Sequence, residues 1–460
     1  MGQTETKSQC DNENEYLDLL SSAEVTQLKK ILCVIDDKPQ NIKVYLENLK
    51  IHLLNFFTPS RTDQLISFLS THCAIATAEN DCGVALMNEV AKITKGGQSQ
   101  IIEFVYQMLS PCEDDLPLSD LKLFCEEALQ CIDHDAIKRF GIATESNERL
   151  FRKLTLNTPE HLDMVKLQKL FEESPVLVEL LLHACQNVFF GNTSFVNQEL
   201  KGSVPVLLPE LEIPAKFNIA PESSILGASD VLFLNGNLPL PQQHKWRFLF
   251  STSFQGESFS KLCAEILNKG PVVIVVREAA GNIFGGYVSS SLVYSSKFQG
   301  TAASFLFTVK PELETFNTTT YNDHYAYLNI GQETMPNGLG MGGQHDYFGF
   351  WLSSDFGKGH SKAKPKCTTY ASPQLSSEDT FNIDALEVWG VGDEPVLDDE
   401  EEDEIGASVI DKHPDAVAIL RVAGKERVSE GLRDNEASAS SMPDMVQLHA
   451  THDPMDYPGP

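Results

Sequence analysis

Apolar residues are spaced in two different ways along the chain, and the change falls near its middle. From Leu17 to about Phe190, apolar positions recur every three or four residues, which is the period of one face of an α-helix. The clearest stripes are Val25, Leu28 and Leu32; Ile42, Leu46, Leu49 and Leu53; and Leu121, Cys125, Ala128 and Ile132. This pattern predicts an all-helical region, which we place at residues 17–225.

Capping residues and prolines mark where several of these helices begin or end. Ser21 and Glu24 have the spacing of a capping box ahead of the first stripe. The second stripe should end near Thr58-Pro59, because the residue before a proline is pushed out of the helical conformation. Thr158-Pro159 and Ser174-Pro175 each place a cap residue before a proline, so we expect helices to start at both prolines.

From about Leu226 the pattern changes to short β-branched and aromatic runs bounded by Gly, Asn and Pro, which predict strands. The runs are Trp246–Phe250, Val272–Val276, Phe305–Val309, Phe348–Leu352 and Leu386–Val391. Between the first two runs, residues 258–267 carry apolar side chains at helical spacing, so one helix is expected there. The predicted fold class is therefore α+β, with the strand-rich domain at residues 226–392.

Acidic residues dominate the chain after Gly392. Residues 393–460 contain eighteen acidic and five basic residues, a net charge of −13 out of −30 for the whole chain. The run from Asp398 to Glu404 repels itself, so we expect an extended linker at residues 393–405. An apolar stripe then predicts an amphipathic helix at 406–434, and residues 435–460, without a periodic pattern, are expected to be disordered. Candidate partner-binding residues on this stripe are Val417, Leu420, Val428 and Leu432.

Composition argues against several functional classes. The net charge of −30 disfavours general DNA or RNA binding, because nucleic-acid affinity depends on cation–phosphate contacts. No apolar run approaches the roughly 20 residues of a membrane-spanning helix. The ten cysteines include no CxxC pair, which disfavours a disulfide framework and a zinc site. We therefore expect neither a metal nor a cofactor.

The first residues, MGQTETK, match the pattern for N-myristoylation at Gly2, and we assign residues 1–16 as a flexible, lipidated N-terminus. They contain no apolar run of signal-peptide length, so we expect the chain to stay in the cytosol. One myristoyl chain binds membranes only marginally, and acidic neighbours such as Glu5 and Asp11 leave no polybasic segment to help it. The second signal is then a protein partner or a palmitoylated Cys10, although an ordinary surface thiol is the simpler interpretation of Cys10.

Two local patterns resemble ligand-binding loops, but each lacks other residues that such a loop needs. Gly83 and Glu89 stand six residues apart, as positions six and twelve of an EF-hand loop do, but Ala78 and Cys82 would occupy ligand positions. We expect an EF-hand-like helix pair without tight calcium binding, and calcium sensing is kept as an alternative. The glycine-rich stretch Asn337–Gly343 lacks the ending of a nucleotide-binding loop, so we expect a tight turn between strands.

The strand-rich domain contains potential catalytic side chains without a recognisable catalytic motif. His324, His345, His360 and Cys367 lie there together with several aspartates. No GxSxG elbow, HExxH helix or papain-like cysteine context activates a nucleophile among them. We therefore predict a protein without enzymatic activity. A peroxide-consuming or hydrolytic enzyme that uses His345 or Cys367 is the alternative.

A lysine-rich segment interrupts the acidity of the chain. Residues 357–366 read GKGHSKAKPK and contain four lysines. A solvated loop is the simplest interpretation, while an acidic protein surface or anionic lipid headgroups would also suit it, because exposed charge steers association. The candidate partner-binding residues in this segment are Lys358, His360, Lys362, Lys364 and Lys366.

Six blocks of the strand-rich domain resemble the TLDc domain family. In chain order they are WRFLFSTSFQGESFSKLC, NIFGGYVSS, FQGTAASFLFTV, GGQHDYFGFWLSSDFGKGHS, CTTYASPQL and FNIDALEVWGVG, within about Leu226 to Gly392. Two longer stretches, YNDHYAYLNIGQETMPNGLGMGGQHDYFGFW and HSKAKPKCTTYASPQL, resemble the lysosomal, mTOR-associated branch of this family. The resemblance implies a β-sandwich flanked by helices, and it carries over no active site.

This resemblance also implies a regulatory function. It suggests a non-enzymatic adaptor on the cytosolic face of the lysosomal membrane, linked to mTOR signalling. The implied partner is the vacuolar proton-pumping ATPase, bound through the TLDc domain and the C-terminal helix. The family is also associated with resistance to oxidative stress, which makes an oxidative-stress enzyme the competing hypothesis.

Overall fold

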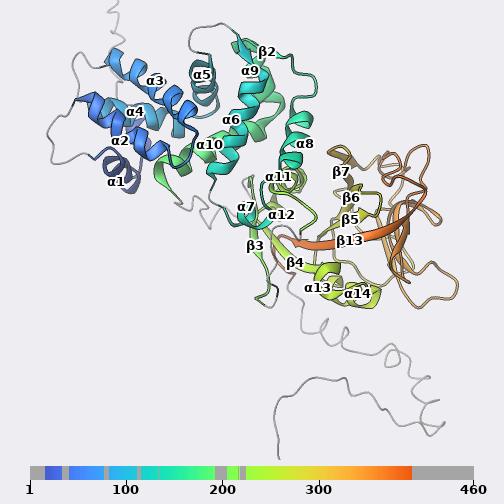
Figure 1. The fold of residues 1–460 in the computed structure, drawn as a ribbon. Helices are drawn as coiled ribbons and strands as arrows, with labels where there is room; N and C mark the ends of the chain where they lie inside the picture. Colours follow the sequence, from blue (N-terminus) through green and yellow to red (C-terminus); the bar gives the residue numbers. More distant parts are fainter. Residues whose placement is uncertain are drawn as a thin grey trace, which may run out of the picture. The chain divides into compact units, whose positions relative to one another are not determined.

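The computed structural model describes residues 16–33, 41–76, 82–110, 115–132, 134–191, 205–215, 217 and 224–395. Figure 1 shows helices over the blue and green part of the chain and most of the strands over its yellow to orange part. The predicted α+β class is confirmed. The helical region contains η1 (Leu17–Leu19), α1 (Ser22–Ile31), α2 (Ile42–Leu53), α3 (Pro59–Ala76), α4 (Cys82–Lys95), α5 (Gln98–Leu109), β1 (Leu116–Pro117), α6 (Leu118–Cys131), α7 (Asp135–Phe140), α8 (Thr144–Leu154), β2 (His161–Leu162), α9 (Met164–Glu173) and α10 (Pro175–Phe190).

The strand-rich part follows and includes four short helices. Its helices are α11 (Ala228–Asn237), α12 (Leu240–Gln243), α13 (Thr252–Gln255) and α14 (Phe259–Ile266). Its strands are β3 (Glu210–Glu212), β4 (Lys245–Ser251), β5 (Val272–Glu278), β6 (Ile283–Val288), β7 (Phe305–Lys310), β8 (Glu314–Asn317), β9 (Ala326–Asn329), β10 (Gly338–Gln344), β11 (Tyr347–Ser353), β12 (Lys358–His360) and β13 (Thr380–Val391).

Local sequence patterns explain where several helices begin. The Glu24 N–H donates to Ser21 Oγ at 3.3 Å and the Ser21 N–H donates to the Glu24 carboxylate at 2.8 Å, which completes the predicted capping box of α1. α2 and α6 cover the second and third predicted stripes and bury their apolar faces. α10 begins with Pro175, as the fixed φ of proline at the first helical position predicts.

The predicted helix start at Thr158-Pro159 is wrong. β2 pairs with β1, with Leu162 opposite Leu116, so the chain after Pro159 is extended. α9 begins later, where the Asp163 side chain accepts the Lys166 N–H at 2.9 Å as an N-cap. Pairing with a distant strand thus overrides a local helix-start pattern and places a small sheet inside the predicted all-helical region.

Gly83 and Glu89 both lie on helix α4, together with every residue between them. A calcium-binding EF-hand loop wraps its ligands around the ion on non-helical backbone. The spacing of these two residues is therefore not that of a calcium loop. α3 and α4 contact each other as a helix pair.

α10 lies at the centre of the helical region because it is apolar on almost every side. Nine of its sixteen residues are buried, and it contacts α1, α4, α5, α6 and α9. A helix that is apolar all round is stable only when neighbouring elements cover all of its faces. The amphipathic helices around α10 supply that cover.

The strands are arranged around β13, the longest of them. The main path is β8-β7-β6-β5-β13-β12-β11-β10-β9, while β4 also pairs with β13 and carries β3 parallel to it. Residues 380–382 of β13 pair with β12, and the rest of the strand pairs with β5 and β4. The five predicted strands fall within β4, β5, β7, β11 and β13, and the predicted helix is α14, so these predictions are confirmed.

The two halves of this sheet pack face to face as a sandwich. Ile274, Phe284 and Leu306 from one half share a buried core with Met341 and Phe350 from the other. The Phe284 and Phe350 rings lie 6.3 Å apart. The alternation of inward and outward side chains along these strands therefore builds one core between the halves and leaves each outer face for other contacts.

The glycine-rich stretch forms strand β10 and not the predicted tight turn. A Cβ on Gly340 would lie 2.6 Å from the Trp351 ring and 2.9 Å from the Phe348 ring, both on β11. The turn comes later, at His345-Asp346 between β10 and β11. The missing side chain at Gly340 thus makes room for large aromatic rings of the neighbouring strand.

Helix α7 packs on the sheet through aromatic rings. The Phe140 ring lies 5.3 Å from Trp389 on β13 and 6.3 Å from Trp246 on β4. Beside it, Arg149 on α8 donates to both carboxylate oxygens of Asp230 on α11 at 3.1 Å. These contacts join the helical region to the strand-rich part of the chain.

Candidate functional site

The lysine-rich segment 357–366 includes β12. This strand lies between β11 and β13 and forms backbone hydrogen bonds with both. Lys358 and Lys366 are exposed and Lys362 is half-buried, whereas the Lys364 ammonium pairs with Asp379. Among the residues described, no ion pair is found for Lys358, Lys362 or Lys366. Three of the four predicted lysines therefore keep an uncompensated positive charge on one short segment.

His360 differs from the lysines beside it. Its ring lies 6.1 Å from the Trp351 ring in a stacked orientation. Burial, together with the charge of Lys362, lowers the pKa of His360 to about 4. His360 is therefore neutral at physiological pH, adds no charge to the segment and packs against the rings of β11.

A group of aromatic and imidazole rings adjoins the lysine-rich segment, separate from the sandwich core. The Phe348 and Trp351 rings stack at 4.7 Å, and the Phe298 ring stacks on His324 at 4.2 Å and on His345 at 5.6 Å. We call these rings the ring cluster: Phe298, His324, Tyr327, His345, Phe348, Trp351 and His360. Through His360, the ring cluster reaches β12, the strand that begins with Lys358.

The potential catalytic side chains do not form a catalytic pair. His345 belongs to the ring cluster, whereas Cys367 is 1% exposed and lies in the sandwich core. Burial raises the pKa of the Cys367 thiol, which keeps it protonated at neutral pH. Within the described ranges, no hydrogen bond joins an imidazole to this thiol and no three His, Cys, Asp or Glu side chains could hold a metal ion. The described geometry therefore does not activate Cys367 through an imidazole.

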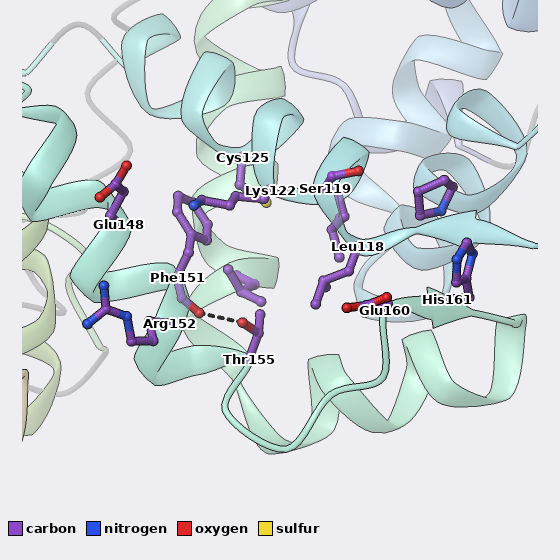
Figure 2. A pocket seen from close by; sticks show the side chains of 13 residues that line it. Leu118, Ser119, Lys122, Cys125, Glu148, Phe151, Arg152, Thr155, Glu160 and His161 are labelled. Carbon is purple, nitrogen blue, oxygen red and sulfur yellow. Dashed lines mark hydrogen bonds between the residues drawn. The ribbon is translucent and has the colours of Figure 1, made fainter.

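A pocket of about 600 Å³ lies in the helical region, mainly between α6 and α8. Figure 2 shows Lys122 and Cys125 of α6 on one wall, Phe151 and Arg152 of α8 on another, and Glu160 near β2. Burial raises the pKa of the Cys125 thiol to about 12, so this cysteine is not a nucleophile at neutral pH. No pattern in the sequence indicates this pocket, because its walls meet only in the folded chain.

The first residues of the predicted acidic linker contact the strand-rich domain. The Lys269 ammonium lies 2.6 Å from the Glu394 carboxylate, and the Arg247 guanidinium lies 3.9 Å from it. The remaining linker, Gly2 and the predicted helix residues Val417, Leu420, Val428 and Leu432 lie outside the described residues. None of the helices that the structure describes has the length and apolar character needed to cross a membrane.

Residues 219–392 match the family model of the TLDc domain. The match contains the whole β4–β13 sandwich, the ring cluster and the lysine-rich segment. This part of the chain is therefore a TLDc domain, and the predicted resemblance to that family is confirmed.

Three relatives are similar to this chain over about the length of the domain or somewhat more. MTOR-associated protein MEAK7 of Gallus gallus is 55% identical over 211 residues, which are 46% of this chain and 44% of that protein. The Homo sapiens protein of the same name is 49% identical over 211 residues, 46% of each chain. Nuclear receptor coactivator 7 of Homo sapiens is 29% identical over 173 residues, 37% of this chain and 17% of that protein. In the first two comparisons the chain spans less than half of the relative's length.

Proposed function

We propose that this chain is a non-enzymatic regulatory adaptor of mTOR signalling that acts on the cytosolic face of lysosomes. The observation that carries the proposal is its 49% and 55% identity to two proteins named for association with mTOR.

The proposed partner is the vacuolar proton-pumping ATPase, bound through the TLDc domain and the predicted helix 406–434. On the TLDc domain we assign contact to Lys358, Lys362 and Lys366, because no ion pair is found for them among the described residues and they lie close together along the chain. Such a surface favours an acidic patch on the partner, since complementary charge raises the rate of association.

A binding measurement with the purified proton pump tests this assignment. The triple variant K358E/K362E/K366E is expected to bind at least tenfold more weakly than the wild type at low salt, because three attractions become repulsions. The matched control is K138E/K166E/K169E, which reverses three lysines of α7 and α9 instead. Equal affinity of both triple variants would contradict a role of the lysine-rich segment.

The proposed membrane anchor is a myristoyl group on Gly2. Gly2→Ala removes the unhindered amine that is acylated, so we expect the variant to leave the lysosomal membrane fraction. Intact mass of the cellular wild-type protein shows whether the acyl group is present. Undiminished membrane recovery of the variant would exclude the anchor and leave the proposed partners to be tested separately.

A further inference from the structure

Helix α2 and its C-cap residue Leu54 present large apolar side chains on the side opposite the buried face of the helix. Val44, Ile51 and Leu54 are 46%, 62% and 45% exposed. Because they are seven and three residues apart, they lie on one side of the helix. The side chains that α2 buries are Tyr45, Leu46, Leu49 and Leu53.

This concentration sets α2 apart from the other elements of the helical region. Among the described residues of this region, the other large apolar side chains that are exposed are Leu19 in η1, Leu123 in α6, Leu156 in the turn after α8 and Val165 in α9. Single exposed apolar residues are normal on soluble proteins, whereas a row of them on one helix marks an interaction surface. A binding partner is therefore expected for α2 and not for the scattered residues.

Three lysines lie at the end of α1 and the start of α2. Lys29 and Lys30 at the end of α1 and Lys43 at the start of α2 are exposed, and no ion pair is found for them in the described part of the chain. The end of α1 is fixed beside α2, because the Asn48 side-chain amide donates to the Leu32 carbonyl at 3.1 Å.

Two other charged residues of α2 affect the charge balance of this surface. Lys50 is neutralised by Asp63 at 2.8 Å, and Glu47 is the exposed acidic residue of the helix. Among the described residues of this surface, basic side chains therefore outnumber acidic ones, in a chain whose net charge is −30. An anionic partner is favoured over a cationic one.

Leu17, which follows the residues of the predicted lipid anchor, is held against α4. The Leu17 N–H donates to the Asn88 side chain at 3.0 Å, and α4, which carries Asn88, contacts α2. Gly2 is fourteen residues before Tyr16, which corresponds to a reach of about 46 Å for an extended chain. An acyl group on Gly2 can therefore enter the same membrane that α2 touches.

We propose that this α2 face, consisting of Val44, Ile51, Leu54, Lys29, Lys30 and Lys43, binds the surface of a membrane that contains anionic phospholipid. It supplies the second signal that a single myristoyl chain needs for stable binding. The lysines attract anionic headgroups, and the apolar side chains enter the boundary between headgroups and acyl chains. This inference rests on the proposed lipid anchor at Gly2.

Sedimentation of the full chain with vesicles tests the proposal. The protein is myristoylated during expression and mixed with vesicles of phosphatidylcholine alone or with three parts in ten phosphatidylserine. We expect V44S/I51S/L54S and K29Q/K30Q/K43Q each to lower the partition coefficient on the mixed vesicles at least tenfold, since each lysine contributes about fivefold. The wild type should bind phosphatidylcholine alone more weakly and should lose affinity on the mixed vesicles as salt rises.

Matched controls make the outcome specific to α2. L123S/L156S/V165S and K138Q/K166Q/K169Q change the same numbers of exposed apolar and basic residues elsewhere in the helical region, and we expect partition within twofold of the wild type. Equal unfolding temperatures would show that all variants fold. If the α2 variants partition as the wild type does while Gly2→Ala is released, the anchor stands and the α2 proposal is overturned. It is also overturned if V44S/I51S/L54S changes only the oligomer mass in light scattering, because the face is then an interface between copies.

Discussion

At the scale of single residues, Glu387 is a buried carboxylate where the helical region meets the TLDc domain. It accepts hydrogen bonds from the Ile225 N–H at 3.1 Å, the Ser224 hydroxyl at 3.2 Å and the Trp389 indole at 3.4 Å. Burial raises the pKa of Glu387 to about 7, although these bonds and the charge of Arg139 act in the opposite direction.

This raised pKa predicts a pH-dependent stability. Between about pH 4.5 and 7 the folded protein keeps the Glu387 proton while the unfolded chain has released it, so the stabilisation present below pH 4.5 is lost as the pH rises to 7. Glu387→Gln cannot titrate. We therefore expect the unfolding temperature of the wild type, minus that of this variant, to decrease as the pH is raised from 5 to 8 in a series of thermal scans. Glu257→Gln, at an exposed site, is the control, and a pH-independent difference for Glu387→Gln would refute the assignment.

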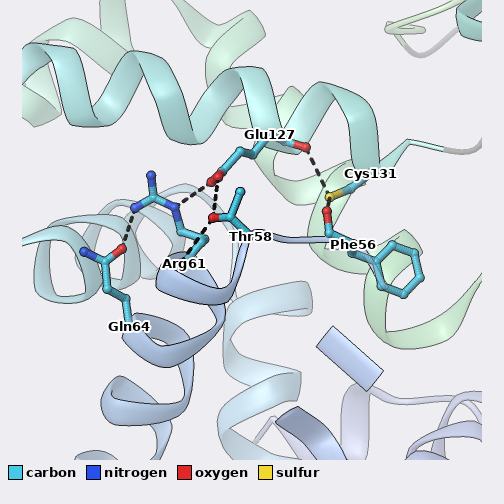
Figure 3. A network of polar contacts seen from close by, with 6 residues as sticks. All are labelled: Phe56, Thr58, Arg61, Gln64, Glu127 and Cys131. Atoms are coloured by element: carbon cyan, nitrogen blue, oxygen red, sulfur yellow. Dashed lines mark hydrogen bonds and ion pairs between the residues drawn. The ribbon is translucent and has the colours of Figure 1, made fainter. Parts of the chain in front are cut away.

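Arg61 and Glu127 form a buried ion pair that joins α3 to α6. The Arg61 Nε–H donates to Glu127 at 2.7 Å, and the Thr58 hydroxyl donates to the same carboxylate at 2.9 Å (Figure 3). Arg61 is 5% exposed and also donates to Gln64 at 2.7 Å. Each carboxylate oxygen of Glu127 therefore has a donor in an apolar surrounding.

Removing one partner of this pair should be costly. Glu127→Met leaves the Arg61 charge buried, and we expect the free energy of unfolding to fall by about 3 kcal/mol. The double variant R61M/E127M should lose less than the sum of the two single variants, because no unpaired charge is left. Denaturant unfolding measures both values, and additive losses would show that the two side chains are not coupled. Lys169→Met on α9 is the exposed control, with little expected change.

At the scale of elements, β10 shows how glycine allows a strand to lie against large rings. Gly340→Ala places a methyl group against Trp351 and Phe348, and we expect a loss of about 1–3 kcal/mol from overpacking. Near-ultraviolet circular dichroism should also change, because these rings belong to the ring cluster. The control is Gly236→Ala on α11. An added Cβ there would meet no atom within 4 Å apart from its own helix backbone and chain neighbours, and alanine is favoured over glycine in a helix. A Gly340→Ala protein as stable as the wild type would contradict the steric explanation.

At the scale of the whole molecule, two truncations distinguish the residues that stabilise the end of the TLDc domain from the residues beyond it that are proposed to bind the proton pump. A chain that ends at Pro395 keeps Glu394 near Arg247 and Lys269, whereas a chain that ends at Gly392 lacks it. We expect the unfolding temperature of the first to equal that of the full chain and that of the second to be lower. Both should bind the proton pump more weakly if helix 406–434 bridges two of its subunits. Unchanged affinity of both truncations would remove the bridging function from the proposal.

The sequence predicted those parts of the fold that depend on neighbours in the chain. The capping box at Ser21 and Glu24, the stripes of α2 and α6 and the five strand runs follow from contacts within a few residues. The order of residues in the chain also placed the four lysines of segment 357–366 close together, whereas the ion pair of Lys364 with Asp379 is visible only in the folded chain. The resemblance to the TLDc family also follows from short blocks of consecutive residues, and residues 219–392 match the family model.

The tertiary structure alone decided the features that depend on distant segments. Thr158-Pro159 is extended because β2 pairs with β1, and Asn337–Gly343 lies largely in a strand because β11 brings Trp351 against Gly340. The neutrality of His360 and the burial of Cys367 come from side chains around them that no local spacing reveals. A hydrophobic period and a helix cap depend on interactions between residues a few positions apart, so the sequence reveals them. Strand pairing, burial and pKa depend on which distant surfaces meet when the chain folds.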